Sequence, residues 1–336
     1  MSKRRAMHPW VFRLFVAWCI VSSSVGVFFR RLLRGRAHPA WSLPFEVAVD
    51  VERRFMQNGF EEAKHGLAVS DAAVPRDPRV ARHVKLTRDE LAGLRADVHT
   101  PKGWREGDPV LLYWHGGGYI AGSPGTHRDL VTRIALHGGV RCIVPNYGKA
   151  PKHPFPEALD TAVACYKTLL ARGIAPSSIF VGGDSAGGGL AVAMTLRLRA
   201  AGATLPRALV LLSPWVDLSC SHPSVRGAHL DILSLEMLSS GAALYAGGTA
   251  ISDHHVSPLG AELAGLPEMF VQTGECEALY SENVLFVERA RAAGVAVEHE
   301  VGPAMVHVFQ LLAFLDGTAD RATRSLGGFV RKSHAS

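Results

Sequence analysis

Short continuous apolar runs recur along the chain from about residue 108 onward, and stretches of helical periodicity separate them. A short apolar run between turn residues is typical of a strand that is buried on both faces of a sheet. Such runs occupy residues 110–114, 140–144, 179–181, 208–212 and 269–271. Apolar and polar positions alternate over residues 295–301 instead, which predicts a strand nearer the edge of the sheet.

Three helical stretches lie between the predicted strands and have recognisable ends. They cover residues 156–172, 187–201 and 281–293, and a glycine follows each of them. Glycine is favoured there because it accepts the left-handed backbone that ends a helix. Strands that alternate with helices form βαβ units, which predicts an α/β fold with a mostly parallel sheet and helices on both faces. Residues 80–100 predict two antiparallel strands at the start of that sheet.

Two stretches do not fit this alternation. Residues 37–78 and roughly 220–255 are helical or irregular in pattern and rich in alanine, leucine and serine. We expect them to form a cap over the carboxyl ends of the strands, where open α/β sheets bind ligands. The predicted organisation is an N-terminal segment, residues 1–36, followed by one α/β domain, residues 37–336.

The positive charge of the chain is concentrated at its N-terminus. The formal net charge is +6, but the first 36 residues hold eight basic residues and no acidic one. The rest carries 28 basic against 30 acidic side chains, and such a body is a poor binder of nucleic acid. The five cysteines are scattered without metal-site spacing, so we expect buried free thiols.

Residues 14–29 form an uncharged, mostly apolar segment between basic residues. As a helix it would span about 24 Å, which is short of the roughly 30 Å hydrocarbon core of a bilayer. Three interpretations stay open: a helix in the membrane interface, the signal peptide of an exported protein, or a helix that packs on a soluble body. Localisation is therefore cytoplasmic or membrane-associated, with export left open.

The stretch from Gly183 to Gly187 has the pattern G-x-S-x-G, with Ser185 at its centre. A predicted buried strand leads into it and a predicted helix leads out of it. Such a sharp turn exposes the serine hydroxyl, and the flanking glycines let the strand and the helix approach closely. The context therefore predicts a nucleophilic serine.

A second motif, His115-Gly116-Gly117-Gly118-Tyr119, follows the predicted strand 110–114. Its glycines leave backbone N–H groups bare, and acyl transfer needs such donors where the carbonyl oxygen becomes an oxyanion. We predict that Gly116 and Gly117 supply two donors and that Ala186, after the nucleophile, supplies a third. The alternative, a phosphate-binding loop, lacks the Gly-Lys-Ser/Thr or G-x-G-x-x-G pattern that it needs.

The general base and its acid should follow the nucleophile in the chain order serine, acid, histidine. His307 lies beyond the last predicted strand, in a loop that is expected to lead into an apolar helix. The acid should follow the strand 269–271, where Glu275, Glu277 and Glu282 are candidates. Its task is to fix the imidazole tautomer and to stabilise the imidazolium, which any of these carboxylates could do.

These motifs together resemble the hormone-sensitive-lipase-like esterases, also called the bacterial family IV lipolytic enzymes. The resemblance covers roughly residues 40–330 and is densest from 108 to 312. The matching stretches are HGGGYIAGSPGTHR (115–128), PNYGKAPKHPFPEALD (145–160), GGDSAGGGLA (182–191), SPWVDLS (213–219) and SPLGAELAGLP (257–267). The resemblance implies an α/β-hydrolase fold and hydrolysis of short- to medium-chain acyl esters, with no metal or organic cofactor.

The resemblance also favours Glu277 as the acid, because the family places it in an Asp-Pro-Leu or Glu-Val-Leu triplet and this chain has Glu277-Ala278-Leu279. The departure from the commoner aspartate leaves Glu275 open. Asp184 and Tyr147 match family positions that brace the elbow and the glycine loop. Two further departures, Gly148-Lys149 and Val306, remove no catalytic atom.

Other functions stay open beside the esterase. The same triad would serve a lactone hydrolase or an N-acyl deacetylase, and a non-catalytic ligand-binding protein on this fold is a third alternative, although it should lack the triad histidine. The expected partner is a small-molecule ester, and a homo-oligomer is left open.

Two short motifs resemble sites of other protein classes. His127-Arg128-Asp129-Leu130 is similar to a kinase motif and is expected to begin a helix. Asp253-His254-His255 is expected to be a loop without a metal.

Overall fold

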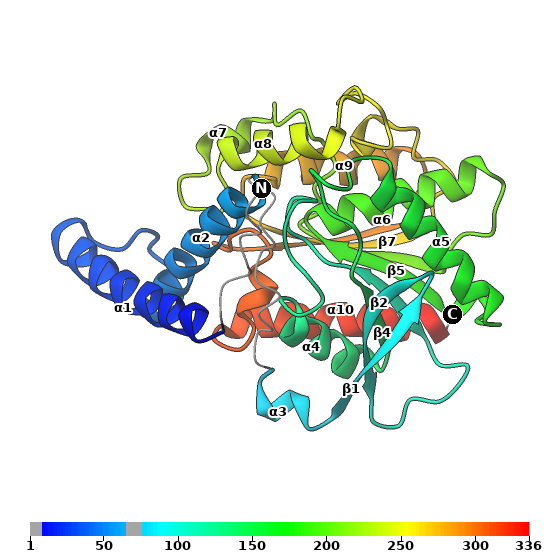
Figure 1. Cartoon of the computed structure of the whole chain (residues 1–336), viewed down its shortest axis with the longest axis horizontal. Helices are drawn as coiled ribbons and strands as arrows, with labels where there is room; N and C mark the ends of the chain where they lie inside the picture. The colour runs from blue at the N-terminus through cyan, green and yellow to red at the C-terminus, as the bar shows by residue number, and fades with distance from the viewer. Residues whose placement is uncertain (1–8, 65–75, 336) are drawn as a thin grey trace, which may run out of the picture.

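Within the part of the chain that the structure describes, eight strands form one mixed sheet at the centre of the molecule (Figure 1). The computed structural model describes residues 9–64 and 76–335 of the chain. The strands are β1 Val84–Leu91, β2 Leu94–Pro101, β3 Val110–Trp114, β4 Arg141–Pro145, β5 Ile179–Asp184, β6 Ala208–Leu212, β7 Glu268–Gly274 and β8 Val297–Gly302. All six strands predicted from the apolar pattern are therefore present, as is the hairpin predicted at 80–100.

The strand order is β1-β2-β4-β3-β5-β6-β7-β8. Strands β1 and β2 are antiparallel, β2 is antiparallel to β4, and all the remaining pairs are parallel. This is the mostly parallel sheet that the sequence predicted. Strand β8 lies at one edge of the sheet, which agrees with the alternating pattern of residues 295–301.

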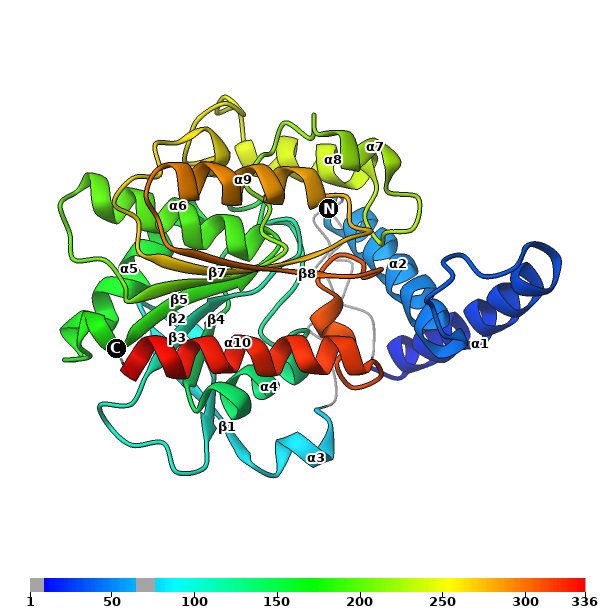
Figure 2. The same cartoon turned by 180° about the vertical axis from the view of Figure 1, so that it is seen from behind.

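Helices cover both faces of the sheet (Figure 2). On one face α4 and α10 pack together, and Leu130, Ile134, Leu326 and Phe329 join the strand side chains in one core cluster. On the other face α5, α6 and α9 contribute Leu159, Leu190 and Phe286 to a second cluster. The helices are α1 Pro9–Arg34, α2 Leu43–Lys64, α3 Pro78–Ala81, α4 Arg128–Gly138, α5 Glu157–Ala171, α6 Ala186–Ala200, α7 Pro223–Gly227, α8 Leu235–Ala246, α9 Tyr280–Ala292 and α10 Gly317–Ala335.

The segment after His307 differs from its prediction. The apolar stretch that follows it is a single 3₁₀ turn, Phe309–Leu312, and not a longer apolar helix. Helix α10 begins only at Gly317 and is amphipathic, with Leu326, Phe329 and Val330 buried. Val308, Phe309 and Leu312 are buried in this turn, whereas Phe314 and Leu315 beyond it are exposed.

The N-terminal segment forms α1, which pairs with α2 as a helical hairpin beside the body (Figure 1). Arg30 and Arg31 both donate to the buried carboxylate of Glu46 on α2. The Trp41 indole N–H, between the two helices, donates to the carbonyl of Ala304 at 2.7 Å. The hairpin is thus bonded directly to the loop that carries His307.

Candidate active site

Ser185 lies at the sharp turn between β5 and α6, as the G-x-S-x-G pattern predicted. Its φ of 52° and ψ of −123° are strained for a residue with a side chain, and strain of this kind concentrates at functional sites. The turn is tight because β5 runs directly into α6. A side chain at Gly183 or Gly187 would collide with the backbone at Trp114, so only glycine permits this approach.

Backbone hydrogen bonds attach the turn to the end of β6. The Ser185 N–H donates to Leu212 at 2.9 Å, and the Trp215 N–H donates to the Ser185 carbonyl at 2.9 Å. The hydroxyl of Ser213 accepts from the N–H of Val308 at 3.2 Å. The loop that carries His307 is therefore held at the same corner of the sheet as the loop that carries Ser185.

His307 lies beside Glu277, and both side chains are almost fully buried. The Nδ1 atom of His307 is 3.4 Å from Oε2 of Glu277, which is an ion-pair distance but long for a charge-assisted hydrogen bond. The other ring nitrogen, Nε2, has no hydrogen-bond partner in the described part of the chain. The imidazole therefore has a carboxylate at one nitrogen and an uncommitted second nitrogen, as a general base needs.

The other two candidate acids have different tasks. Glu275 is exposed, and its Oε2 accepts from the N–H of Ala304 at 2.8 Å, which braces the His307 loop from outside. Glu282 is buried, and its Oε1 accepts from the N–H groups of Val216 and Asp217. Of these three acids, Glu277 is the one that lies against the imidazole of His307.

A fourth carboxylate, that of Asp231, connects the loop of His307 to the loop of Glu277. Its Oδ1 accepts from the N–H of His307 at 2.8 Å, and its Oδ2 accepts from the N–H of Ala278 at 2.8 Å. Asp231 precedes α8 and is almost fully buried. From α2, Arg53 donates to the carbonyls of Leu230 and Asp231, which fixes this segment in turn.

The electrostatics of the histidine follow from these neighbours. Burial alone would lower the pKa of His307, but the carboxylates of Glu277 and Asp231 raise this pKa above its ordinary value. Burial raises the pKa of Glu277 against the opposing effect of His307. In this pair, the buried carboxylate of Glu277 thus favours the imidazolium that His307 would form transiently.

The glycine loop contains Gly116, one of the predicted oxyanion donors. The N–H of Gly116 donates to Oδ2 of Asp184 at 3.1 Å, so it is already committed and does not point into free space. The sequence could not reveal this because the acceptor lies 68 residues further along the chain. The next residues, Gly117 and Gly118, have φ values of 118° and 61°. At the start of α6, the N–H of Ala186 belongs to the first helical turn, where N–H groups lack helical acceptors.

Asp184 braces the elbow and the glycine loop together, as the resemblance implied. Its Oδ1 accepts from the Tyr113 hydroxyl at 2.7 Å, and its Oδ2 lies 3.1 Å from Nε2 of His127. Burial alone would raise the pKa of Asp184, but His127 and Tyr113 lower it overall. The hydroxyl of Tyr147 donates to the carbonyl of His115 at 2.8 Å, which confirms that Tyr147 supports this loop.

Three residues near the site were not foreseen from the sequence. His127 precedes α4, as its helix-start prediction required, but its ion pair with Asp184 was missed. Asp231 lies in an irregular stretch with no pattern to mark it. Glu52 on α2 has a buried carboxylate oxygen without a hydrogen-bond partner in the described chain. Burial raises the pKa of Glu52 to about 7, and the charges of His307 and Asp231 act on it from nearby.

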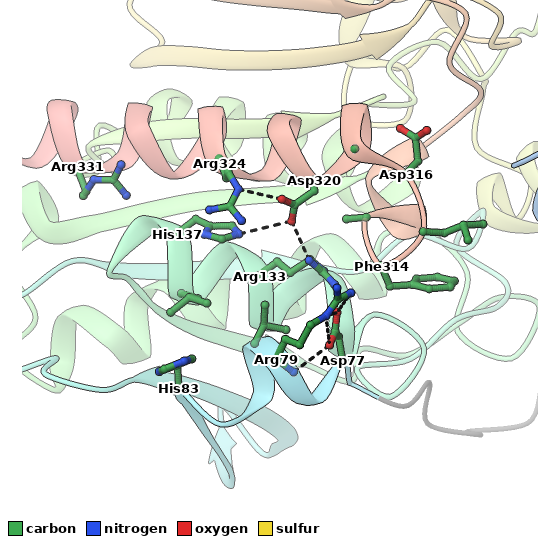
Figure 3. Close-up of a pocket in the computed structure, with 15 residues that line it drawn as sticks. Asp77, Arg79, His83, Arg133, His137, Phe314, Asp316, Asp320, Arg324 and Arg331 are labelled. Atoms are coloured by element: carbon green, nitrogen blue, oxygen red, sulfur yellow. Dashed lines mark hydrogen bonds and ion pairs between the residues drawn. The ribbon is translucent and has the colours of Figure 1, made fainter. Parts of the chain in front are cut away.

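Two further features lie apart from these residues. Asp253, His254 and His255 bring their potential ligand atoms within 4.8 Å of one another on a loop, but Asp253 already accepts from the N–H of His255. A cleft of about 880 Å³ lies between α3, α4 and α10, and none of the predicted site residues lines it (Figure 3). Its central guanidinium, that of Arg133, is paired with aspartates.

All five cysteines are free thiols, and four of them are buried, as predicted.

This fold and this arrangement agree with comparisons to known proteins. Residues 111–311 match the model of the α/β-hydrolase fold family. The chain belongs to this family and, within it, to the hormone-sensitive-lipase-like enzymes. A solved esterase from the bacterial hormone-sensitive lipase family is 34% identical, with a TM-score of 0.75 over 98% of this chain and 99% of that one.

Proteins similar to this chain include esterases and acetyl-hydrolases. An acetyl-hydrolase of Streptomyces hygroscopicus is 38% identical over 229 residues, which are 68% of this chain and 77% of that protein. An esterase of Acinetobacter venetianus is 35% identical over 259 residues, 76% of this chain and 84% of that protein. This chain is accordingly an esterase on the α/β-hydrolase fold.

Proposed function

We propose that the chain hydrolyses carboxylic esters by acyl transfer through Ser185, His307 and Glu277. The observation that carries this proposal is the buried pair in which Glu277 lies 3.4 Å from Nδ1 of His307, while Nε2 is left uncommitted. The hydrogen bonds from the end of β6 to the Ser185 turn and, through the Ser213 hydroxyl, to the His307 loop support it further, because they hold both loops at one corner.

In the proposed reaction, Nε2 of His307 takes the proton of the Ser185 hydroxyl as its oxygen attacks the ester carbonyl. The resulting tetrahedral oxyanion collapses, and His307 returns the proton to the departing alcohol. Water then attacks the acyl-enzyme with the same base, and the acid product leaves. Glu277 keeps Nδ1 protonated and stabilises the imidazolium in both steps.

We propose that the oxyanion is held by the N–H groups of Gly117, Gly118 and Ala186. This set replaces Gly116 because the N–H of Gly116 is bonded to Asp184. The positive end of α6 adds to the field at this point. Each such donor contributes about 10²–10³ in rate in well-studied hydrolases.

We propose esters with short to medium acyl chains as substrates, bound under a cap formed by residues 37–64 and 220–255. The Phe60 ring of α2 lies so close to Gly118 that a side chain at Gly118 would collide with it, and Gly241 of α8 adjoins the same ring. Helices α2 and α8 thus meet over the glycine loop, which supports a cap at this position. The name acetyl-hydrolase carried by one similar protein supports a small acyl group. Residues 65–75 of the predicted cap lie outside the described residues.

The experiment that tests this proposal combines labelling with a substrate series. The unsubstituted enzyme should react with a fluorophosphonate, and Ser185→Ala should lose both labelling and at least about 10⁴-fold of its p-nitrophenyl acetate hydrolysis. A Ser185→Ala variant that still labels and turns over would remove the nucleophile assignment. The rates with p-nitrophenyl esters of increasing acyl length, a lactone and an anilide then separate the esterase from its two hydrolytic alternatives.

A further inference from the structure

Helix α1 carries a row of large apolar side chains that faces away from the protein. We call this row the α1 stripe, and each of its members exposes more than half of its surface. Its members are Trp18, Val21, Val25, Phe28, Phe29 and Leu32. Apart from the adjacent pair Phe28 and Phe29, successive members are three or four residues apart, so they lie along one side of the helix. A soluble helix normally shows the opposite arrangement, with its apolar side turned inward.

The opposite side of α1 is fixed to the protein. Cys19, Ser23 and Val27 are fully or almost fully buried there. At the end of the helix, Arg30 and Arg31 place their guanidinium groups on the buried carboxylate of Glu46. The stripe therefore points outward because the other side is already occupied, and α1 extends away from the body of the protein (Figure 1).

The positive charge around the α1 stripe favours binding to a negatively charged surface. The first 36 residues hold eight basic residues and no acidic one, and Arg34 and Arg36 are exposed just beyond the stripe. Basic residues that flank an apolar helical face favour anionic lipid headgroups, and tryptophan favours the boundary between headgroups and acyl chains. A second copy of the same helix would bring an equal positive charge and would be repelled.

We propose that α1 docks the enzyme on an anionic lipid surface, lying in the plane of the interface with the α1 stripe among the acyl chains. Residues 16–34 are long and apolar enough to cross a bilayer. A crossing helix, however, would have to give up the packing of Val27 and the ion pairs to Glu46. Lying in the plane satisfies both sides of the helix at once.

Docking in this way would keep the active-site loops close to the membrane. The hairpin of α1 and α2 is joined to the His307 loop through Trp41, and α2 is joined to Asp231 through Arg53. The docking proposal does not depend on the assignment of the triad, because it rests on exposure, packing and charge at α1 alone.

The test uses the full-length protein and vesicles of phosphatidylcholine with or without phosphatidylglycerol. We expect the protein to float with the vesicles that contain phosphatidylglycerol, and less so at high salt. The combined substitution Phe28→Gln, Phe29→Gln and Leu32→Gln should lower vesicle affinity by about a hundredfold. Hydrolysis of p-nitrophenyl acetate in lipid-free buffer should stay within about twofold, which shows that this variant folds.

A matched control removes three exposed apolar side chains from the body, through Leu285→Gln, Phe314→Gln and Leu315→Gln. This variant should bind vesicles as the unsubstituted protein does. The docking proposal is wrong if the unsubstituted protein ignores both kinds of vesicle, or if the two variants bind equally well. It is also wrong if the stripe substitutions convert a lipid-free dimer into monomers without changing vesicle binding, because the stripe would then cover a second copy.

Discussion

Asp231 accepts a hydrogen bond from the backbone N–H of His307, with 2.8 Å between Oδ1 and the nitrogen. Its other oxygen accepts from the N–H of Ala278, the residue that follows Glu277. One buried carboxylate therefore sets the distance between the loop of the proposed acid and the loop of the proposed base. We regard Asp231 as a positioning residue, since it acts on catalysis through His307 and Glu277.

We predict that Asp231→Asn lowers kcat/KM for p-nitrophenyl acetate by about 10–100-fold, mostly through kcat. One of the two N–H groups would then face an amide N–H₂, and the His307 loop would shift. Removing this negative charge also lowers the pKa of His307, so the acidic limb of the kcat/KM profile should move to lower pH. An unchanged pH profile together with a reduced rate would mean that Asp231 supports folding only. Glu275→Gln, which removes a brace outside the site, is the control.

Much of the fold could be predicted because burial leaves a direct record in the sequence. Strands β3 and β6 have the bounds that the apolar pattern predicted, since every residue in them is buried. The positions of Ser185 and His307 followed from motif and chain order. The hydrogen bond from the Gly116 N–H to Asp184 could not be predicted, because it depends on where the side chain of Asp184 points.

The remaining parts of the site depend on contacts that no local pattern records. Asp231 and Arg53 lie 178 residues apart and meet only because α2 packs beside the segment that precedes α8. The outward orientation of the α1 stripe was equally hidden. The sequence shows an apolar segment, but only the packing of Val27 and Glu46 decides which side of the helix is turned to solvent.

The three candidate acids can be separated by amide substitution. Glu277→Gln should lower kcat by about 10²–10⁴-fold, because the imidazolium loses its buried partner and the tautomer of His307 is no longer fixed. Since Glu277 raises the pKa of His307, the acidic limb of the variant's profile should also lie at lower pH. Glu275→Gln should cost less than about tenfold. A larger loss at Glu275 than at Glu277 would transfer the role of the acid to Glu275.

A further prediction concerns the ion pair between His127 and Asp184. His127→Gln should lower the free energy of unfolding by about 3–5 kcal/mol near pH 6, because Asp184 would remain buried without a countercharge. Its partner Asp184 raises the pKa of His127 against the effect of burial. The stabilisation is therefore full below the ordinary histidine pKa and is lost as the pH rises through the raised value. Urea unfolding of the unsubstituted protein and the variant at several pH values should show that the difference between their free energies of unfolding becomes smaller at alkaline pH. A difference in free energy that grows with pH would contradict the charged pair.

The last prediction concerns Arg133, whose buried guanidinium donates to Asp77, Asp129 and Asp320 at 2.8–2.9 Å. Figure 3 shows the contacts with Asp77 and Asp320. Arg133→Met should cost about 3–5 kcal/mol in urea unfolding, because three carboxylates lose their shared cation. Arg324→Met is the control, since this exposed partner of Asp320 should contribute only about 0–1 kcal/mol. Arginine hydrogen bonds lower the pKa of Asp77, and Arg324 and Arg133 lower that of Asp320 against the effect of burial. The stabilisation is therefore present above the ordinary carboxyl pKa and is lost as the pH falls through the lowered values. If the two methionine variants were equally stable at neutral pH, the network around Arg133 would contribute no more than a surface ion pair.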